Sequence, residues 1–243
     1  MGWWYMGPLL RSVLVDVSTQ RDFLDAEGAL PVQNREALLP RLRRMMALAR
    51  AARLPVISSV DTHRETDPLN GVPRHCIEGT TGQQKIPFTL LAQRIVVEAD
   101  NTIDLPYCVL SRFRQVIFRK QDYDFFSNPK ADRLLTELDA GEFVLFGVGL
   151  ERSVKALALG LLARHKKVAV VIDACGYWSE ADADLATRQL RAKGIRITTV
   201  DELASALRAP RTRDRARIGS PDRHHPLKRS HASKGTRTRT MSA

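Results

Sequence analysis

The stretch EFVLFGVGLERSVKALALGLLARH, Glu142 to His165, carries the signals of a strand, a tight turn and a helix. Its apolar run FVLF leads into Gly147-Val148-Gly149, whose two glycines permit a sharp turn. Beyond the turn apolar residues recur at helical spacing, so Ser153 is expected near a helix start at the carboxyl end of a strand. Backbone N–H groups at a helix start favour an anion or a developing oxyanion. Such a turn can present a nucleophile.

Short β-branched runs alternate with amphipathic stretches on both sides of this segment. Strands are expected at residues 12–17, 55–60, 94–99, 115–119, 142–147, 167–173 and 195–200. Helices are expected at residues 35–52, 130–137, 151–164 and 179–193, the last with Ser179 and Asp182 as a capping pair. This order predicts an α/β fold in three layers, with a parallel sheet covered by helices on both faces.

Polar side chains stand where several of the expected strands end, and sites in such sheets lie beyond those ends. The first strand ends at Asp16, the second at Asp61 and His63, and a later one at Lys120, while the quoted strand leads to Ser153. Each has an ordinary alternative: Asp16 as a helix cap, Lys120 as a surface lysine, Ser153 as a capping hydroxyl. Together they predict that a carboxylate, an ammonium group and a hydroxyl converge at one edge of the sheet.

Composition narrows the class of protein. The chain of 243 residues fits one large α/β domain or two small ones, and its 44% hydrophobic content is enough for a sizeable core. Its three cysteines, Cys76, Cys108 and Cys175, are odd in number and lack C-x-x-C spacing, which argues against a disulfide framework. A reducing cytoplasm is therefore the expected location. No run approaches the roughly 18 apolar residues of a membrane span, so no membrane partner is expected.

The charge is unevenly distributed and divides the chain into three expected parts: an N-terminal extension (1–11), a domain (12–207) and a basic tail (208–243). The tail holds eleven of the 38 Lys and Arg residues and two of the 27 Asp and Glu residues, so it carries +9 of the net charge of +11. It has almost no large apolar residues and no periodicity, which predicts disorder. Any nucleic acid would bind through this tail, and a merely solvated tail is the alternative.

Three segments of the expected domain resemble the isochorismatase-like cysteine hydrolases, a family that includes nicotinamidases and N-carbamoyl amidohydrolases. VDVSTQRDFL is similar to the opening strand with the catalytic aspartate, at Asp16, and VIFRKQDYDFF to the strand that ends in the catalytic lysine, at Lys120. FGVGLERSV is similar to the segment with a non-proline cis peptide bond before Gly149, and it places Ser153 where the family has its cysteine. The resemblance implies a Rossmann-like α/β/α domain with a mostly parallel six-stranded sheet.

The chemistry that the resemblance implies needs a nucleophile, a base and a cation, at Ser153, Asp16 and Lys120. Backbone N–H groups of Gly149 and Ser153 would form the oxyanion hole. Serine is less readily activated than cysteine, which leaves three interpretations: a serine nucleophile with Lys120 as a neutral base, attack by water, or a pocket without catalysis. Cys175, at the end of the next expected strand, is a further candidate thiol.

A second motif concerns metal binding. DTHRETDPLNGVPRHCIEGTTG is similar to the nicotinamidase metal and pocket loop, and it implies Asp61, His63 and His75 as ligands. Carboxylate and imidazole groups suit Zn, Mn or Fe. The family's additional histidine between DTH and HC is absent here, and hydrogen-bonded pocket histidines without a metal are the alternative.

The sequence therefore predicts a hydrolase of the isochorismatase and nicotinamidase type that acts on a small-molecule amide or related C–N bond. Serine at the nucleophile position makes a catalytically inactive homologue, which binds a small ligand or serves in assembly, the alternative. The resemblance also implies a homo-oligomer.

Overall fold

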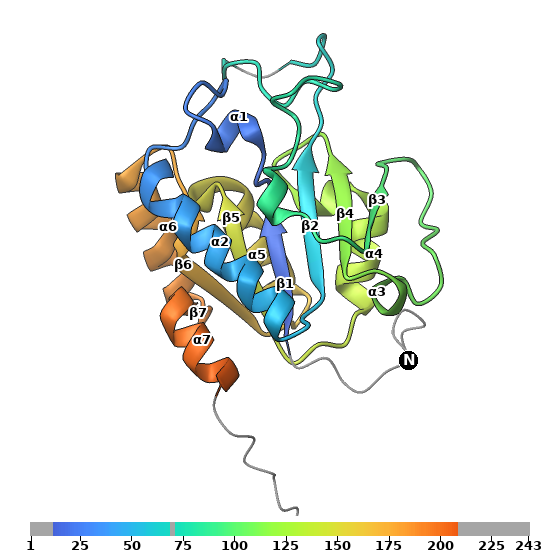
Figure 1. The fold of residues 1–243 in the computed structure, drawn as a ribbon, viewed down its shortest axis with the longest axis vertical. Helices are drawn as coiled ribbons and strands as arrows, with labels where there is room; N and C mark the ends of the chain where they lie inside the picture. The colour runs from blue at the N-terminus through green and yellow to red at the C-terminus, as the bar shows by residue number, and fades with distance from the viewer. Residues whose placement is uncertain (1–11, 69–70, 209–243) are drawn as a thin grey trace, which may run out of the picture. The chain divides into compact units, whose positions relative to one another are not determined.

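A computed structural model describes residues 12–208, except for residues 69 and 70. Its sheet is built from seven parallel strands in the order β3-β4-β2-β1-β5-β6-β7 (Figure 1). These are β1 (Val13–Val17), β2 (Val56–Asp61), β3 (Arg94–Val97), β4 (Gln115–Lys120), β5 (Phe143–Val148), β6 (Val168–Gly176) and β7 (Arg196–Thr198). The six-stranded sheet that the resemblance implied is one strand too small, because all seven expected strand segments join the sheet, with the short strands β3 and β7 at its edges.

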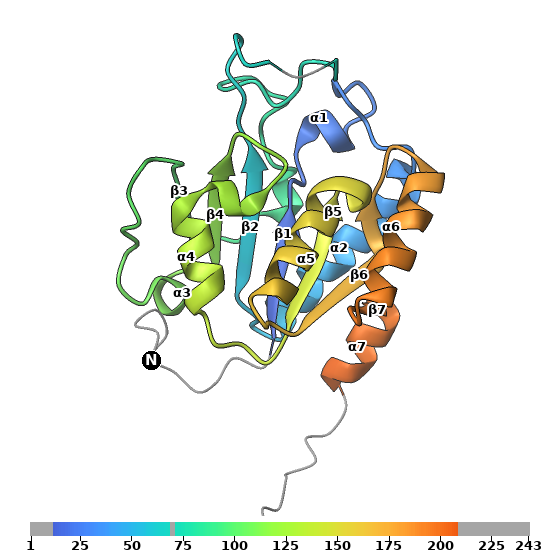
Figure 2. The same ribbon diagram turned by 180° about the vertical axis from the view of Figure 1, so that it is seen from behind.

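Helices cover both faces of the sheet, as Figures 1 and 2 show from opposite sides. One face carries α4 (Pro129–Glu137), α5 (Lys155–Ala163) and α6 (Glu180–Ala192), and the other carries α2 (Arg35–Ala51) and α7 (Val200–Arg208). The remaining helical segments are short: α1 (Arg21–Leu24), α3 (Val109–Arg112), η1 (Pro87–Thr89), η2 (Phe125–Ser127) and the π-helical turn η3 (Leu150–Val154). The three-layer α/β/α prediction is confirmed.

Successive side chains of β1 point alternately into the two apolar cores on either face of the sheet. Val13, Val15 and Val17 pack into the apolar core beneath α4, α5 and α6, whereas Leu14 packs into the core beneath α2 and α7. Successive strand residues point to opposite faces, so Asp16 shares the face of Leu14. All five residues are buried. The sheet therefore fixes Asp16 in the interior, at the carboxyl end of the central strand.

Local capping sets the helix starts. The Asn128 side chain accepts hydrogen bonds from the N–H groups of Lys130 and Ala131 at the start of α4. The Ser179 hydroxyl accepts one from the N–H of Asp182 (3.2 Å) at the start of α6, as the sequence predicted. Helix α7 was not predicted, and its buried Val200 belongs to the core under α2.

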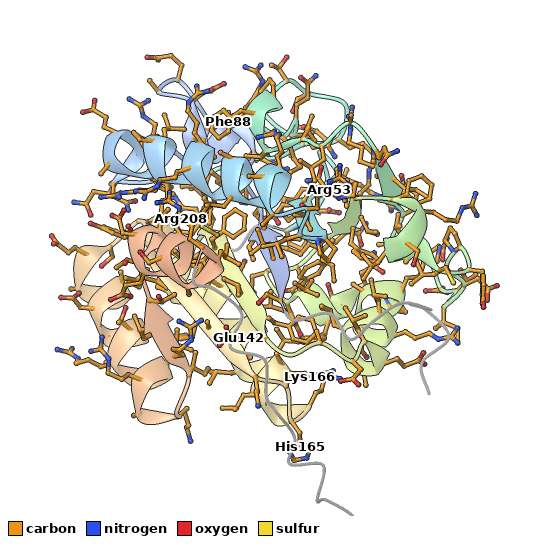
Figure 3. The ribbon with its side chains drawn as sticks, turned by 60° about the horizontal axis from the view of Figure 1, so that its bottom comes forward. Arg53, Phe88, Glu142, His165, Lys166 and Arg208 are labelled. Carbon is orange, nitrogen blue, oxygen red and sulfur yellow. The ribbon has the colours of Figure 1, made fainter. Side chains whose placement is uncertain are left out.

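The two ends of the sheet differ in character. Figure 3 shows the end near the amino termini of the strands, where Glu142, His165 and Lys166 lie in the connections. Glu142 accepts two hydrogen bonds from Arg196 there (2.6 and 2.9 Å), a surface contact that ties β5 to β7. Most of the long connection between β2 and β3 lies at the opposite end, beyond the tips of the strand arrows (Figure 1). None of the described helices is long and apolar enough to span a membrane. The predicted tail (208–243) lies outside the described residues, except for Arg208.

Candidate active site

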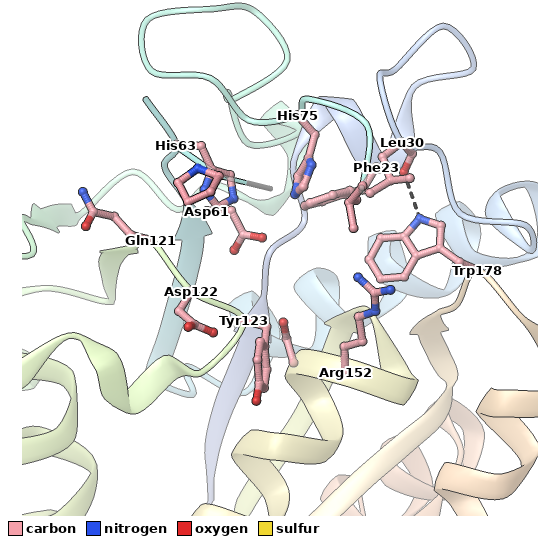
Figure 4. A pocket seen from close by; sticks show the side chains of 13 residues that line it. Phe23, Leu30, Asp61, His63, His75, Gln121, Asp122, Tyr123, Arg152 and Trp178 are labelled. Atoms are coloured by element: carbon pink, nitrogen blue, oxygen red, sulfur yellow. Dashed lines mark hydrogen bonds between the residues drawn. The ribbon is translucent and has the colours of Figure 1, made fainter. Parts of the chain in front are cut away.

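A cavity of about 380 Å³ opens beyond the carboxyl ends of β1, β2, β4 and β5 (Figure 4). Four of the predicted site residues line it: Asp61, His63, His75 and Ser153. The other lining residues are Phe23, Leu30, Pro68, Val72, Gln121, Asp122, Tyr123, Arg152 and Trp178. The cavity lies where the strand-end rule predicted a site.

Ser153 belongs to the π-helical turn between β5 and α5. The Val148–Gly149 peptide bond before this turn is cis, as the family resemblance implied. The carbonyl oxygen of Gly149 accepts hydrogen bonds from the N–H groups of Arg152 (3.2 Å) and Val154 (3.1 Å), which closes the turn. Ser153 is 7% exposed, and its hydroxyl has no hydrogen-bond partner among the described residues. The hydroxyl is therefore free to meet a molecule in the pocket that Ser153 lines.

Gly149 is required by the packing of Trp178. A Cβ atom at position 149 would lie 2.2 Å from the indole ring, far inside van der Waals contact. The indole is held in place because its Nε1–H donates to the carbonyl oxygen of Leu30 (3.0 Å). One carboxylate oxygen of Glu151 accepts the backbone N–H groups of Trp178 (2.7 Å) and Ser179 (3.3 Å). The loop after β6 and the turn that carries Ser153 are thus one packed unit.

Asp16 is fully buried and already has three partners. Its Oδ1 accepts from the Thr19 hydroxyl (2.8 Å), and its Oδ2 accepts from the Ser58 hydroxyl (3.1 Å). The ammonium group of Lys85 forms an ion pair with Oδ2 (2.8 Å) and donates to Thr19 (2.7 Å). Lys85 could not be predicted from the sequence, because it lies in a loop that gives no periodic signal.

Lys120, also fully buried, pairs with a different carboxylate. The parallel register of β2 and β4 sets Lys120 beside Asp61, and the two form an ion pair. The Lys120 ammonium also donates to the carbonyl oxygen of Asp122 (2.9 Å). The same oxygen of Asp61 that contacts Lys120 accepts the Ser18 hydroxyl (2.8 Å).

The predicted Asp16, Lys120 and Ser153 are therefore arranged as two buried ion pairs and one pocket hydroxyl. Asp16 and Lys120 have no contact with each other among the described hydrogen bonds and ion pairs, and neither lines the cavity. In the sheet order β4-β2-β1-β5, Lys120 ends β4, Asp61 ends β2, Asp16 lies near the end of β1, and Ser153 follows β5. Of the two buried, paired carboxylates, Asp61 lines the pocket and Asp16 does not.

Replacing Lys85 is expected to destabilise the fold strongly. In the Lys85→Met variant the Asp16 carboxylate stays buried without its countercharge, and removal of one partner of a buried pair costs about 3–5 kcal/mol. Urea unfolding monitored by circular dichroism measures the loss of unfolding free energy. Lys193→Met, at an exposed lysine after α6, is the matched control. A loss below about 1 kcal/mol would show that the pair does not hold Asp16 in place.

Asp61, His63 and His75 form a cluster suited to a metal ion. One potential ligand atom from each lies within 4.8 Å of the others. The Nδ1 of His75 lies 2.7 Å from the carbonyl oxygen of Pro73, so this nitrogen carries the proton and Nε2 is left to bind a cation. The two contacts of Asp61 described above both involve Oδ1, which leaves Oδ2 as the second acceptor. One carboxylate and two imidazoles fit a divalent metal of the Zn, Mn or Fe type.

Electrostatics favours the protonation states that a metal requires at Asp61 and His63. Burial alone would raise the pKa of Asp61, but the charge and hydrogen bond of Lys120 outweigh it and hold the pKa below its usual 3.8. The Asp61 ion pair therefore stabilises the fold above pH 3.8, and this contribution is lost as the pH falls through the lowered value. Burial lowers the pKa of His63 despite the attraction of Asp61, so this imidazole is neutral at pH 7.

The cysteines are not part of this arrangement. Burial raises the pKa of the Cys76 and Cys175 thiols far above their usual range, and neither residue lines the cavity. The Cys175 thiol donates to the carbonyl oxygen of Val171 (3.3 Å) inside the core. Cys175 is thus a packed core residue, and the pocket holds a hydroxyl where the family resemblance implies a thiol.

The match to an isochorismatase domain model over residues 12–202 identifies the class: the chain belongs to the isochorismatase family. An isochorismatase-like hydrolase from Alkaliphilus metalliredigens shares its fold with a TM-score of 0.66 at 21% identity, over 81% of this chain and 98% of the other. The pyrazinamidase of Pyrococcus horikoshii in complex with zinc has a TM-score of 0.59 at 24% sequence identity, over 78% of this chain and 99% of the other. The MAR1 ribonuclease from Caenorhabditis elegans has a TM-score of 0.56 at 18% sequence identity, over 84% of this chain and 83% of the other. No curated protein matches the sequence significantly.

Proposed function

We propose that this chain hydrolyses a small carboxamide, or a related C–N bond, in the cavity beyond β5. The observation that carries the proposal is the position of Ser153, which lines the cavity on the turn that follows the cis peptide bond. Membership of the isochorismatase family and the neighbouring nicotinamidase and pyrazinamidase structures support this choice of reaction.

In the proposed reaction the Ser153 hydroxyl attacks the amide carbonyl carbon and passes its proton through an intervening water molecule to Asp16, which does not itself line the cavity. The amine leaves after taking up a proton, and water then cleaves the ester to release the acid and the free hydroxyl. A carboxylate has about four acceptor positions, and three of those on Asp16 are filled by Thr19, Ser58 and Lys85. One position therefore remains for the proton.

Charge that develops on the substrate oxygen is stabilised from two sides. The backbone N–H groups of Gly149 and Ser153 are proposed as the oxyanion hole. In other hydrolases one such donor lowers the activation free energy by about 3–4 kcal/mol. Lys120, which forms an ion pair with the pocket residue Asp61, supplies positive charge. This assignment uses Lys120 as a cation rather than as the base, because its ammonium group already contacts the Asp61 carboxylate and the carbonyl oxygen of Asp122.

A metal at Asp61, His63 and His75 fits this function. When bound, such an ion polarises a carbonyl group or lowers the pKa of a bound water molecule. The zinc complex of the Pyrococcus pyrazinamidase supports zinc as the first metal to test. The chain's own residues supply the ligand set and its orientation, with Pro73 fixing the tautomer of His75.

One observation favours a second candidate, a homologue that binds a small ligand without turnover. Asp16 and Lys120 each neutralise another buried group, and the Ser153 hydroxyl has no base in contact among the described residues. Such a site could hold an amide and leave it intact.

Ammonia release from a panel of carboxamides and N-carbamoyl compounds, with mass spectrometry of the products for these and for vinyl ethers, separates the two candidates. The hydrolase proposal predicts turnover of at least one amide or N-carbamoyl compound, with loss in Asp16→Asn. Ligand binding by calorimetry without any turnover across the panel would favour the non-catalytic homologue.

A further inference from the structure

The pocket contains a positive charge that the proposed reaction does not use. Arg152 directly precedes Ser153, lines the cavity and is exposed. No carboxylate among the described residues lies within ion-pair distance of its guanidinium group. Its one described contact is with the indole of Trp178, whose ring centroid lies 5.7 Å from Cζ. The charge is therefore available to a molecule in the cavity.

An aromatic wall accompanies this charge. Trp178 is fixed by its hydrogen bond to Leu30, and Phe23 meets its ring edge-on with the centroids 5.6 Å apart. Figure 4 shows Arg152 extending from its turn toward Trp178, on the same side of the pocket as Phe23. A planar apolar group can pack on this wall while the guanidinium binds an anionic substituent.

The opposite side of the pocket has a different charge character. Asp61, His63 and Asp122 lie there, across the cavity from Arg152 (Figure 4). The oxygen-rich side repels an anion in the absence of a metal, while the Arg152 side attracts one. The pocket therefore distinguishes the two ends of an elongated ligand.

We infer that Arg152 binds a carboxylate of the substrate, so that the substrate is a small planar carboxamide bearing a second, anionic group. This inference rests on the proposed function, since it places the amide at Ser153 and the anion at Arg152. A guanidinium binds a carboxylate through two parallel N–H donors, which sets orientation as well as affinity. Arg152 is then a specificity-determining residue of the pocket.

Isothermal titration calorimetry with 4-carbamoylbenzoate and its methyl ester tests this assignment. The two probes share the ring and the amide and differ in one negative charge, and EDTA in the buffer removes competing metal charge. Wild type is expected to bind the carboxylate about tenfold or more tightly than the ester, because a hydrogen-bonded charge contributes at least that factor. Arg152→Gln should abolish the preference, and Arg152→Lys should retain part of it.

Arg188→Gln is the matched control, because Arg188 is an exposed arginine of α6 outside the pocket. It should keep the full preference. Equal binding of both probes by wild type, no measurable binding of the carboxylate, or an unchanged preference in Arg152→Gln would each overturn the inference. Calorimetry measures binding and does not require turnover. If the protein hydrolyses nothing but still prefers the carboxylate through Arg152, the proposed function fails and this inference stands.

Discussion

Ser153→Cys is expected to create a thiol that iodoacetamide alkylates about tenfold or more faster than any native cysteine. The new thiol would stand at the helix start that lines the cavity, where N–H groups and the positive charge of Lys120 favour a thiolate. A fall of one unit in the pKa of a thiol raises its thiolate fraction at neutral pH about tenfold. Burial works in the opposite direction on Cys76 and Cys175, because it raises their pKa values.

Peptide mapping by mass spectrometry after timed alkylation gives the rate at each thiol. Ser205→Cys is the control, since Ser205 is exposed on α7 and its replacement reports an accessible thiol far from the proposed site. The fast reaction of the Ser153→Cys variant should slow in the double variant that also carries Lys120→Met. A thiol at position 153 that is no more reactive than the one at position 205, and insensitive to Lys120, would mean that the pocket does not activate a nucleophile there.

Loss of two imidazoles is expected to remove metal binding almost completely. The His63→Ala/His75→Ala variant keeps only the Asp61 carboxylate of the three-residue cluster, so we expect zinc affinity to fall roughly 100-fold or more. Wild type, with three protein ligands, is expected to hold metal weakly and below one ion per chain after purification. Equilibrium dialysis followed by elemental analysis measures both quantities.

The control for this experiment is His165→Asn, at an exposed histidine far from the cluster. His165 has a φ of 58°, a conformation that asparagine tolerates, so the substitution should not disturb the fold. A tightly held zinc ion that survives the double substitution would place the metal elsewhere. No zinc binding by wild type under replete conditions would identify His63 and His75 as pocket residues only.

Much of the arrangement could be predicted because it follows from strand ends. Asp16, Asp61 and Lys120 stand at or near the ends of buried parallel strands, and Ser153 follows a glycine turn, so periodicity alone placed them at one edge of the sheet. The histidines were found through the similarity of one loop to a family motif. The sequence signals were strong where a side chain is tied to regular secondary structure.

Contacts between side chains on different strands and loops could not be predicted in the same way. Lys85 lies in the long connection between β2 and β3, and only the folded loop brings its ammonium group to Asp16. The approach of Trp178 to Gly149, and hence the aromatic wall beside Arg152, depends on packing across the sheet rather than on spacing. Helix α7 went unrecognised because its sequence runs directly into the basic tail.

The central claim is that Ser153 is the nucleophile of an amide hydrolase, and the comparison of wild type with Ser153→Ala tests it most directly. The measurement is kcat/KM for ammonia release from the best substrate of the carboxamide panel, with both proteins equally folded by circular dichroism. We expect the variant to lose roughly 10³-fold or more, since removal of a nucleophile leaves only binding and oxyanion stabilisation. Equal kcat/KM in the two proteins would contradict the claim and leave attack by water as the reaction in this pocket.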